Sequence, residues 1–228
     1  MDKPPVLNAL SRVLVTFPRL GSQGVLIPGG FVLTAAHCLV DEKNRTPYPH
    51  NKAFTPFSMA FTARNALGKE FPLMPLTIDL VSDVAILEIS NQVGHYKGNK
   101  ADRTLFGDFA VAEVDSIPEF LVDLPIDLDI QWRKAWVHIH QTGWKQIRVK
   151  EGVRHHNELI IESEVPIGPE STGGPIVTKW GKLLGVVSGE LTQKKNKNYR
   201  GSFAHATAVL PTWYHWEMED REEDEDLD

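Results

Sequence analysis

A short stretch near the start of the chain, VLTAAHCL (residues 32–39), joins an apolar, β-branched run to a histidine. Such a run predicts a strand that leads into a turn, and the turn presents His37. A second stretch, SDVAILEI (residues 82–89), carries Asp83 at the start of an apolar strand. A third, GPESTGGPIV (residues 168–177), places Ser171 and Thr172 in a glycine-rich turn before another strand. Together they supply a histidine, a carboxylate and a hydroxyl.

These residue types are the ones that acyl transfer by an activated hydroxyl requires. A hydroxyl is a weak nucleophile until a base takes its proton, and histidine can take it near neutral pH. A carboxylate orients the imidazole and stabilises the imidazolium that forms. Glycines after the nucleophile let the backbone approach the substrate, and N–H groups of the turn can stabilise an oxyanion. The three stretches therefore indicate a candidate catalytic site.

Short β-type runs recur along the rest of the chain and are separated by turn-forming residues. Many short strands, together with 15 prolines and 17 glycines, predict a barrel or a sandwich. One helix is expected in TWYHWEME, because Pro211 can open a helix there. The runs are RVLVTF (12–17), QGVLI (23–27), FVLT (31–34), VAILEI (84–89), AWVHIH (135–140), LII (159–161), PIVTK (175–179), LLGVVS (183–188) and FAHATAVL (203–210).

Composition points to a soluble globular protein. The 228 residues suffice for one large or two small domains, and 42% hydrophobic with 24% charged residues is ordinary. No apolar run approaches the ~20 residues that span a bilayer, and the first residues do not resemble a signal peptide. The single cysteine, Cys38, cannot form an internal disulfide, which favours a reducing, cytoplasmic location. Its apolar context favours a buried structural thiol over a catalytic one.

Charge is distributed unevenly along the chain. The formal net charge is −6, but residues 217–228 hold nine acids and one arginine. The remainder is therefore close to neutral, and neither nucleic-acid binding nor attraction to a membrane is implied. The acidic run is expected to be disordered and solvated, with a role as an interaction segment as the alternative.

The three stretches and their order resemble the chymotrypsin/trypsin-like serine peptidase family. TAAHC (34–38) and DVAIL (83–87) match its histidine and aspartate motifs, and TGGP (172–175) matches its S-G-G-P except at the first residue. GVVSGE (185–190) and ATAVLPTWYHW (206–216) resemble its substrate-pairing strand and its closing strand and helix. The resemblance covers about residues 10–216. It implies an all-β fold of two six-stranded antiparallel β-barrels with a C-terminal helix and the site in the cleft between the barrels.

The turn residues and extended character of stretch 91–133 suggest a connection between two halves, with a boundary near residue 118, and the resemblance implies a subtype. Residues 1–118 would form the first barrel and the connection, residues 119–216 the second barrel and terminal helix, and residues 217–228 the acidic tail. PIGPESTGGP (166–175) is more similar to the bacterial Deg-type peptidases than to secreted trypsins, whose freed Ile-Val-Gly-Gly start is absent. No PDZ-like segment follows in this sequence. A peptidase domain that needs no proteolytic activation is therefore expected.

Carried over residue by residue, the family pattern assigns the site. His37, Asp83 and Thr172 would be the catalytic triad, and the backbone N–H groups of Glu170 and Thr172 would form the oxyanion hole. A peptide or protein would be the substrate, with no cofactor and no metal. The pocket that receives the side chain before the scissile bond carries no acid at its base, which predicts small or medium apolar residues there. Its lining residues would be Pro166, Ser188, Gly189 and Glu190.

Two residues depart from the family pattern. Thr172 adds a methyl group where the family has serine, which restricts χ1 and can turn the hydroxyl away from His37. Glu170 stands where the family has glycine; if this position needs a positive φ, glutamate is strained there. A flip of the peptide, turning a carbonyl toward the hole, would relieve that strain. Ser171 is an alternative nucleophile, although Gly173-Gly174-Pro175 fixes the register against it. The sequence thus leaves open a slow peptidase and a pseudopeptidase that holds a peptide or partner.

Two further features of the sequence each allow two interpretations. His138 and His140 share one face of a predicted strand, which is how a metal site can begin. No further ligand lies at a telling spacing, so ordinary core or surface histidines are the preferred interpretation. KKNKNYR (194–200) is a basic loop after the presumed substrate strand. It is expected to be solvated, and the alternative is that it attracts acidic substrate or the acidic tail.

Overall fold

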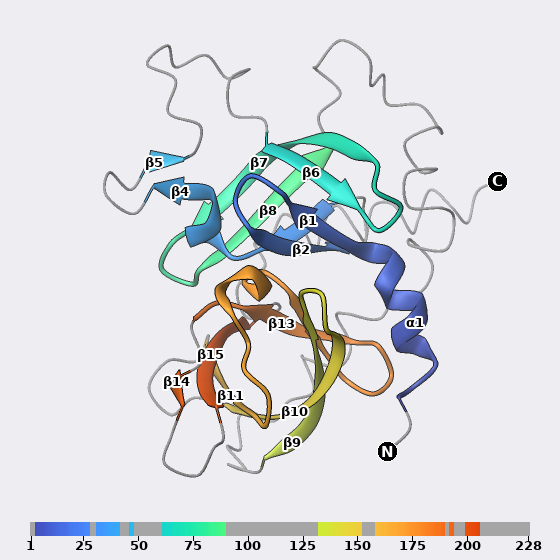
Figure 1. Cartoon of the computed structure of the whole chain (residues 1–228). Coiled ribbons are helices and arrows are strands. Elements are labelled where there is room, and N and C mark those ends of the chain that lie inside the picture. Colours follow the sequence, from blue (N-terminus) through green and yellow to red (C-terminus); the bar gives the residue numbers. More distant parts are fainter. Residues whose placement is uncertain are drawn as a thin grey trace, which may run out of the picture.

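The structure is a computed structural model of the chain, and Figure 1 shows that strands make up most of the part that it describes. It describes residues 3–27, 31–41, 46–47, 61–89, 132–151, 158–189, 192–193 and 199–205. The helical elements among these are short: α1 (Val6–Leu10), η1 (Ser11–Val13), η3 (Ala36–Leu39) and η6 (Pro169–Ser171). The strands form two curled sheets, which lie one above the other in Figure 1, and a small ribbon of β4 (Val40–Asp41) and β5 (Thr46–Pro47).

The first half of the chain closes into an antiparallel barrel with the strand order β1-β2-β3-β8-β7-β6. Strands β2 and β3 are buried along their whole length, whereas β6 alternates between buried and exposed residues as a strand with one solvent face does. The strands are β1 (Leu14–Phe17), β2 (Ser22–Ile27), β3 (Phe31–Thr34), β6 (Phe61–Asn65), β7 (Glu70–Asp79) and β8 (Val84–Ile89).

The second half forms a sheet with the order β11-β10-β9-β12-β13-β15-β14. Because β15 also pairs with β11, six of these strands curl round on themselves, and β14 extends from β15. The strands are β9 (Arg133–Ile139), β10 (Gly143–Glu151), β11 (Glu158–Ser163), β12 (Pro175–Val177), β13 (Leu183–Val187), β14 (Thr192–Gln193) and β15 (Tyr199–His205). The two-barrel, all-β fold predicted from the sequence is confirmed.

Two apolar clusters fill the barrels, and one of them crosses the junction. The smaller cluster lies in the second barrel and includes Val137, Ile161 and Ile176. The larger fills the first barrel and also takes in Trp144 and Val186 from the second. Burial of this shared apolar surface fixes the barrels against each other, which is what allows one site to draw residues from both.

Several sequence-based predictions lie outside the described residues. These are the domain boundary near residue 118, the helix after Pro211, the acidic run 217–228 and most of the basic stretch 194–200. Within the described part of the chain, no helix has the length and apolar character needed to cross a bilayer.

Candidate active site

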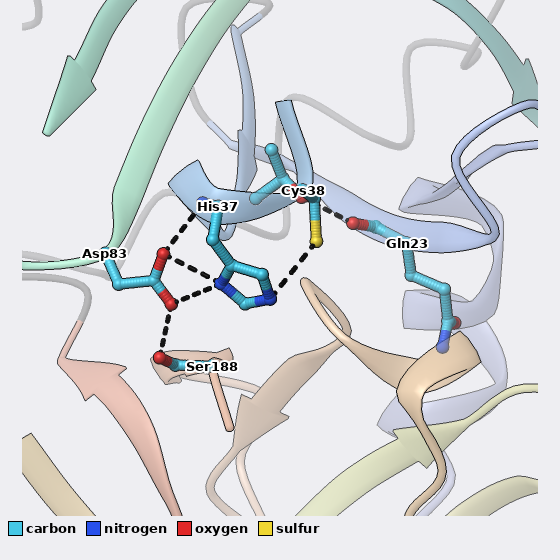
Figure 2. Close-up of polar contacts among 6 residues, drawn as sticks. Gln23, His37, Cys38, Asp83 and Ser188 are labelled. Atoms are coloured by element: carbon cyan, nitrogen blue, oxygen red, sulfur yellow. Dashed lines mark hydrogen bonds and ion pairs between the residues drawn. The ribbon is translucent and has the colours of Figure 1, made fainter. Parts of the chain in front are cut away.

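His37 is presented by the short turn η3, which follows directly from β3. Its ring Nδ1 lies 2.9 Å from Oδ1 and 2.8 Å from Oδ2 of Asp83, and Figure 2 shows the carboxylate facing the ring edge. The backbone N–H of His37 also donates to Asp83 Oδ1 at 2.9 Å. The backbone of Ala36 donates to the carbonyl of Asp83 at 3.2 Å. Backbone and side chain together therefore fix the histidine against the carboxylate.

Asp83 precedes β8 with φ of 54°, a left-handed conformation that short polar residues tolerate best. The Ser188 hydroxyl, just after β13 of the second barrel, donates to Asp83 Oδ2 (Figure 2). The carboxylate thus accepts hydrogen bonds from both barrels. Ser188 was predicted to line the substrate pocket, and the structure places its hydroxyl on the aspartate.

The Asp83 carboxylate controls the charge of His37. Its hydrogen bond, followed by that of the Cys38 thiol, raises the pKa of His37 to about 10, against the opposing effect of burial. The imidazolium is therefore the favoured form at neutral pH in this conformation. The other ring nitrogen, Nε2, lies 3.8 Å from Cys38 Sγ. A half-buried thiol, rather than the fully buried one expected, thus stands beside the nitrogen that would act as the base.

The turn that carries Thr172, the predicted nucleophile, comes from the second barrel. After Gly168 the chain forms η6, in which Ser171 N donates to Gly168 O at 2.9 Å and Thr172 N donates to Pro169 O at 3.0 Å. Thr172 is 7% exposed. The hydrogen bonds found among the described residues include none between the Thr172 hydroxyl and His37. The structure therefore assembles the His37–Asp83 pair but does not link it to the threonine.

The predicted oxyanion hole is not formed in this conformation. The Thr172 N–H, one of its two expected donors, is occupied by the Pro169 carbonyl. Among the described residues, only Asp83 and Gln141 combine a side chain with positive φ, so Glu170 is not in the left-handed region. A helical turn suits both Pro169 at its first position and a residue with a Cβ at position 170. We call residues 168–172 in this arrangement the closed turn.

The side chain of Glu170 folds back over the same turn. A Cβ added to Gly168 would lie 2.4 Å from Glu170 Oε2 and 2.5 Å from Oε1. A carboxylate held there places negative charge beside the turn that should stabilise an oxyanion. Charge and backbone geometry at position 170 therefore act in the same unfavourable direction.

Ser171, the alternative nucleophile, is fully buried, and its Oγ accepts a hydrogen bond from the backbone N–H of His140 at 3.1 Å. That contact ties the turn to the end of β9. Pro166, the predicted base of the pocket, is exposed, and Gly189 is half-buried. Glu190 lies outside the described residues. The predicted substrate-binding residues therefore remain predictions.

The two glycines after Thr172 serve a close approach within the protein. Gly173 has φ of +79°, and a Cβ there would lie 2.0 Å from the Gln23 carbonyl oxygen and 2.3 Å from Thr34 Oγ1. At Gly174 a Cβ would lie 2.7 Å from the Ser171 carbonyl oxygen. The sequence suggested that these glycines admit substrate. In the structure they let the turn pack directly on β2.

His138 and His140 do not form a metal site among the described residues, where no group of three metal-ligating side chains is found. Burial, with smaller effects from His140 and Lys3, lowers the pKa of His138 to about 4, so the ring is neutral. Its Nδ1 lies 2.7 Å from Oε1 of Gln23. Sequence reasoning passed over Gln23, although a glutamine beside the apolar run GVLI was a visible signal.

Comparisons with known proteins bear on the fold. No protein-family model matches the chain, and no curated protein sequence matches it. Among solved structures, the serine endoprotease from Yersinia pestis is similar with a TM-score of 0.50 and 14% identity over 91% of this chain and 65% of that chain. The active form of the Rv3671c protease from M. tuberculosis gives 0.49 and 17% over 89% and 80%. The MamO protease domain from Magnetospirillum magneticum gives 0.48 and 15% over 88% and 95%. At such identities the likeness to the Yersinia protein establishes the trypsin-like two-barrel fold.

Proposed function

We propose that the chain is a slow peptide-bond hydrolase that works through an acyl-enzyme with His37, Asp83 and Thr172. The observation that carries this proposal is the His37–Asp83 pair. The Asp83 carboxylate meets His37 Nδ1 at 2.8 Å and accepts a second bond from Ser188. Such a pair serves a neighbouring nucleophile, because the carboxylate fixes the tautomer that leaves Nε2 available as the base.

In the proposed reaction, deprotonated Nε2 of His37 takes the proton of the Thr172 hydroxyl as Oγ1 attacks the substrate carbonyl carbon. The C–N bond then breaks, the imidazolium returns the proton to the leaving amine, and an ester to Thr172 remains. Water, deprotonated by His37 in the same way, hydrolyses that ester and releases the acid. Asp83 stabilises the imidazolium in both halves without taking the proton itself.

The closed turn supports a slow reaction. For the Thr172 N–H to reach an oxyanion, the peptide between Pro169 and Glu170 has to rotate and withdraw the Pro169 carbonyl. The loss of one oxyanion donor typically costs about 10²–10³ in rate. The rotation also takes Glu170 toward a conformation that suits glycine better. Hydrolysis would therefore come from a minor, open population of the turn.

A second function is favoured by the same closed turn. A pseudopeptidase would hold a peptide or protein at the junction of the two barrels without cleaving it. Threonine at the nucleophile, glutamate at position 170 and the occupied Thr172 N–H all suit such a binding module. The His37–Asp83 pair favours the hydrolase, since binding alone does not require it.

Substitution of the nucleophile distinguishes the two functions. Thr172→Ser removes one methyl group and should raise peptide hydrolysis by ten-fold or more, about 1.4 kcal/mol in the barrier. Peptides with small or medium apolar residues before the scissile bond are the first substrates to test. Thr178→Ser is the matched control, because it makes the same change in another buried turn. A background rate that Thr172→Ser leaves unchanged, together with measurable peptide binding, would favour the binding module.

A further inference from the structure

A single glutamine of the first barrel is bonded to the nucleophile turn of the second. Gln23 on β2 is 1% exposed, and a buried carboxamide needs hydrogen-bond partners on both its ends. Its Oε1 lies 2.7 Å from His138 Nδ1, and its Nε2 donates to the Glu170 carbonyl at 3.4 Å. Its backbone N–H donates to the Thr172 carbonyl at 2.8 Å. Figure 2 shows the side chain extending away from His37 toward the turn.

The two bonds to the turn lie on either side of Ser171. One holds the carbonyl of Glu170 and the other the carbonyl of Thr172, so two peptide planes of the closed turn are fixed by one residue. The turn has no room to slide, because Gly173 packs directly on the Gln23 backbone. The backbone of Gln23 is also held in place, since Thr34 Oγ1 donates to its carbonyl oxygen at 2.6 Å.

His138 sets the orientation of the carboxamide. The partly buried ring is neutral, because burial lowers the pKa of His138 to about 4. Oε1 of Gln23 can only accept, so Nδ1 of His138 carries the hydrogen and donates it. The edge of the His138 ring meets Trp144 with ring centroids 5.3 Å apart, which restrains the ring. With Oε1 directed to His138, the NH₂ group of Gln23 is directed to Glu170.

We propose that Gln23 is a positioning residue that holds the nucleophile turn closed, and that it thereby sets how often the oxyanion hole opens. The inference rests on the proposed function, in which hydrolysis requires an open turn. Rotation of the peptide before Glu170 changes φ of that residue, and it displaces the Glu170 carbonyl unless ψ of Pro169 turns by an equal and opposite amount. The bond from Gln23 Nε2 opposes that displacement and so favours the closed turn.

Amide exchange of Thr172 tests the inference without reference to activity. Its N–H is bonded to Pro169 O in the closed turn and should exchange slowly in the wild-type chain. Gln23→Met keeps the length of the side chain and removes both polar ends, and it should speed this exchange ten-fold or more. Gln146→Met makes the same change on β10 and should leave it unaltered. NMR of the full chain, with global stability measured in parallel, separates local opening from unfolding.

A second variant guards against loss of folding. Gln23→Glu keeps an acceptor for His138 but replaces the donor to Glu170 with a carboxylate oxygen, and it should also speed Thr172 exchange. Unchanged exchange in folded Gln23→Met or Gln23→Glu would overturn the inference. If neither variant folds, the exchange rate of the carboxamide protons of Gln23 in the wild-type chain tests the inference. Slow exchange supports the bonds described, and rapid exchange overturns them.

Hydrolysis in the Thr172→Ser background separates this inference from the proposed function. Gln23→Met should there raise kcat with little change in KM, because the hole acts on the transition state. If Gln23→Met speeds amide exchange of Thr172 but no hydrolysis is detected in the Thr172→Ser background, the proposed peptidase activity is contradicted and the role of Gln23 is still supported. If hydrolysis is detected but Gln23→Met leaves the amide exchange of Thr172 unchanged, the peptidase activity is supported and the role of Gln23 is contradicted.

Discussion

The two halves of the candidate site differ in how fully they are assembled. In the first barrel, His37 and Asp83 are joined through a side chain and through the backbone, and both lie in motifs that resemble those of trypsin-like peptidases. In the second, the turn departs from the motif at Glu170 and Thr172 and directs its N–H inward to Pro169. The predicted acid–base half is thus assembled, whereas the half predicted to stabilise charge is closed.

The difference shows which part of such a site depends on a single residue. The His37–Asp83 pair is held by several bonds that converge on one carboxylate, so no single neighbour decides its geometry. The turn depends on one torsion, φ of Glu170, which a side chain biases away from positive values. One substitution at that position can therefore disable half of a site while the other half stays intact.

The largest expected effect comes from a substitution that breaks the His37–Asp83 pair. In the Thr172→Ser background, Asp83→Asn should lower kcat/KM by about 10³–10⁴, because an asparagine holds the imidazole in the wrong tautomer. Asp79→Asn is the matched control: its carboxylate accepts hydrogen bonds from Val81 and Ser82 in the preceding turn, and activity should stay within a few-fold. Hydrolysis that survives Asp83→Asn would show that the pair is not catalytic.

The second-largest expected effect comes from a substitution that opens the closed turn. Glu170→Gly removes both the side chain that disfavours positive φ and a carboxylate beside the turn, and it should raise kcat by about 10²–10³. Combined with Thr172→Ser it should exceed either change alone, because both act on one transition state. Amide exchange of Thr172 should speed up in parallel. A glycine variant with unchanged kcat and slow exchange would contradict the account of the closed turn.

The charge of His37 predicts a dependence on pH. The Asp83 hydrogen bond raises the pKa of His37 to about 10, and an imidazolium cannot accept the proton of Thr172. Below that pKa, kcat/KM should therefore rise about ten-fold per pH unit, or about 10² between pH 7 and 9. Asp83→Asn should move the midpoint of the profile to lower pH. A profile already flat above pH 7 would show that the base is neutral there.

Packing of the turn on β2 predicts a stability difference between two glycines. Gly173 and Gly143 both have positive φ, +79° and +78°, but a Cβ meets backbone only at Gly173. Gly143→Ala should cost about 1–2 kcal/mol for the torsion alone. Gly173→Ala should cost about 1–3 kcal/mol more, because the Gln23 carbonyl oxygen has to move. Denaturant unfolding of both variants measures the difference, and equal costs would contradict the close approach.

The sequence predicted the strands that carry continuous β-branched runs, such as β3, β8 and β12. It missed β7 (Glu70–Asp79), because Pro72 and Pro75 argue against a strand. The structure accommodates Pro75 with a shift of register between Pro75 and Thr77 where β7 pairs with β8. Pro72 lies in register opposite Thr62 of β6. The short helix α1 was also missed. Leu7 and Leu10 are buried in the larger apolar cluster, which draws on both barrels, and that packing lies beyond local sequence signals.

At the site, residue-level reasoning named His37 and Asp83, which the structure brings together, and named Thr172 and Glu170 as the two departures from the family pattern, since the preferences of a side chain are local. It did not give the bond from Ser188 to Asp83 or the bonds of Gln23. Both link the two barrels, across 105 residues between Ser188 and Asp83 and 147 between Gln23 and Glu170. Contacts of this kind appear only when the packing of one barrel on the other is known.

The smallest expected effect concerns charge outside the described residues. Residues 217–228 hold nine acids, and KKNKNYR (194–200), which begins after β14 and ends in the first two residues of β15, is basic. Twelve extended residues reach roughly 40 Å at about 3.3–3.6 Å each, so we propose that the acidic run screens the site through this stretch. Its deletion should raise hydrolysis or peptide binding less than ten-fold, and most at low salt, where charges are least screened. A neutral replacement of equal length should act like the deletion if charge, rather than bulk, is responsible. Equal activity with and without the run across a salt series would leave it a solubility element.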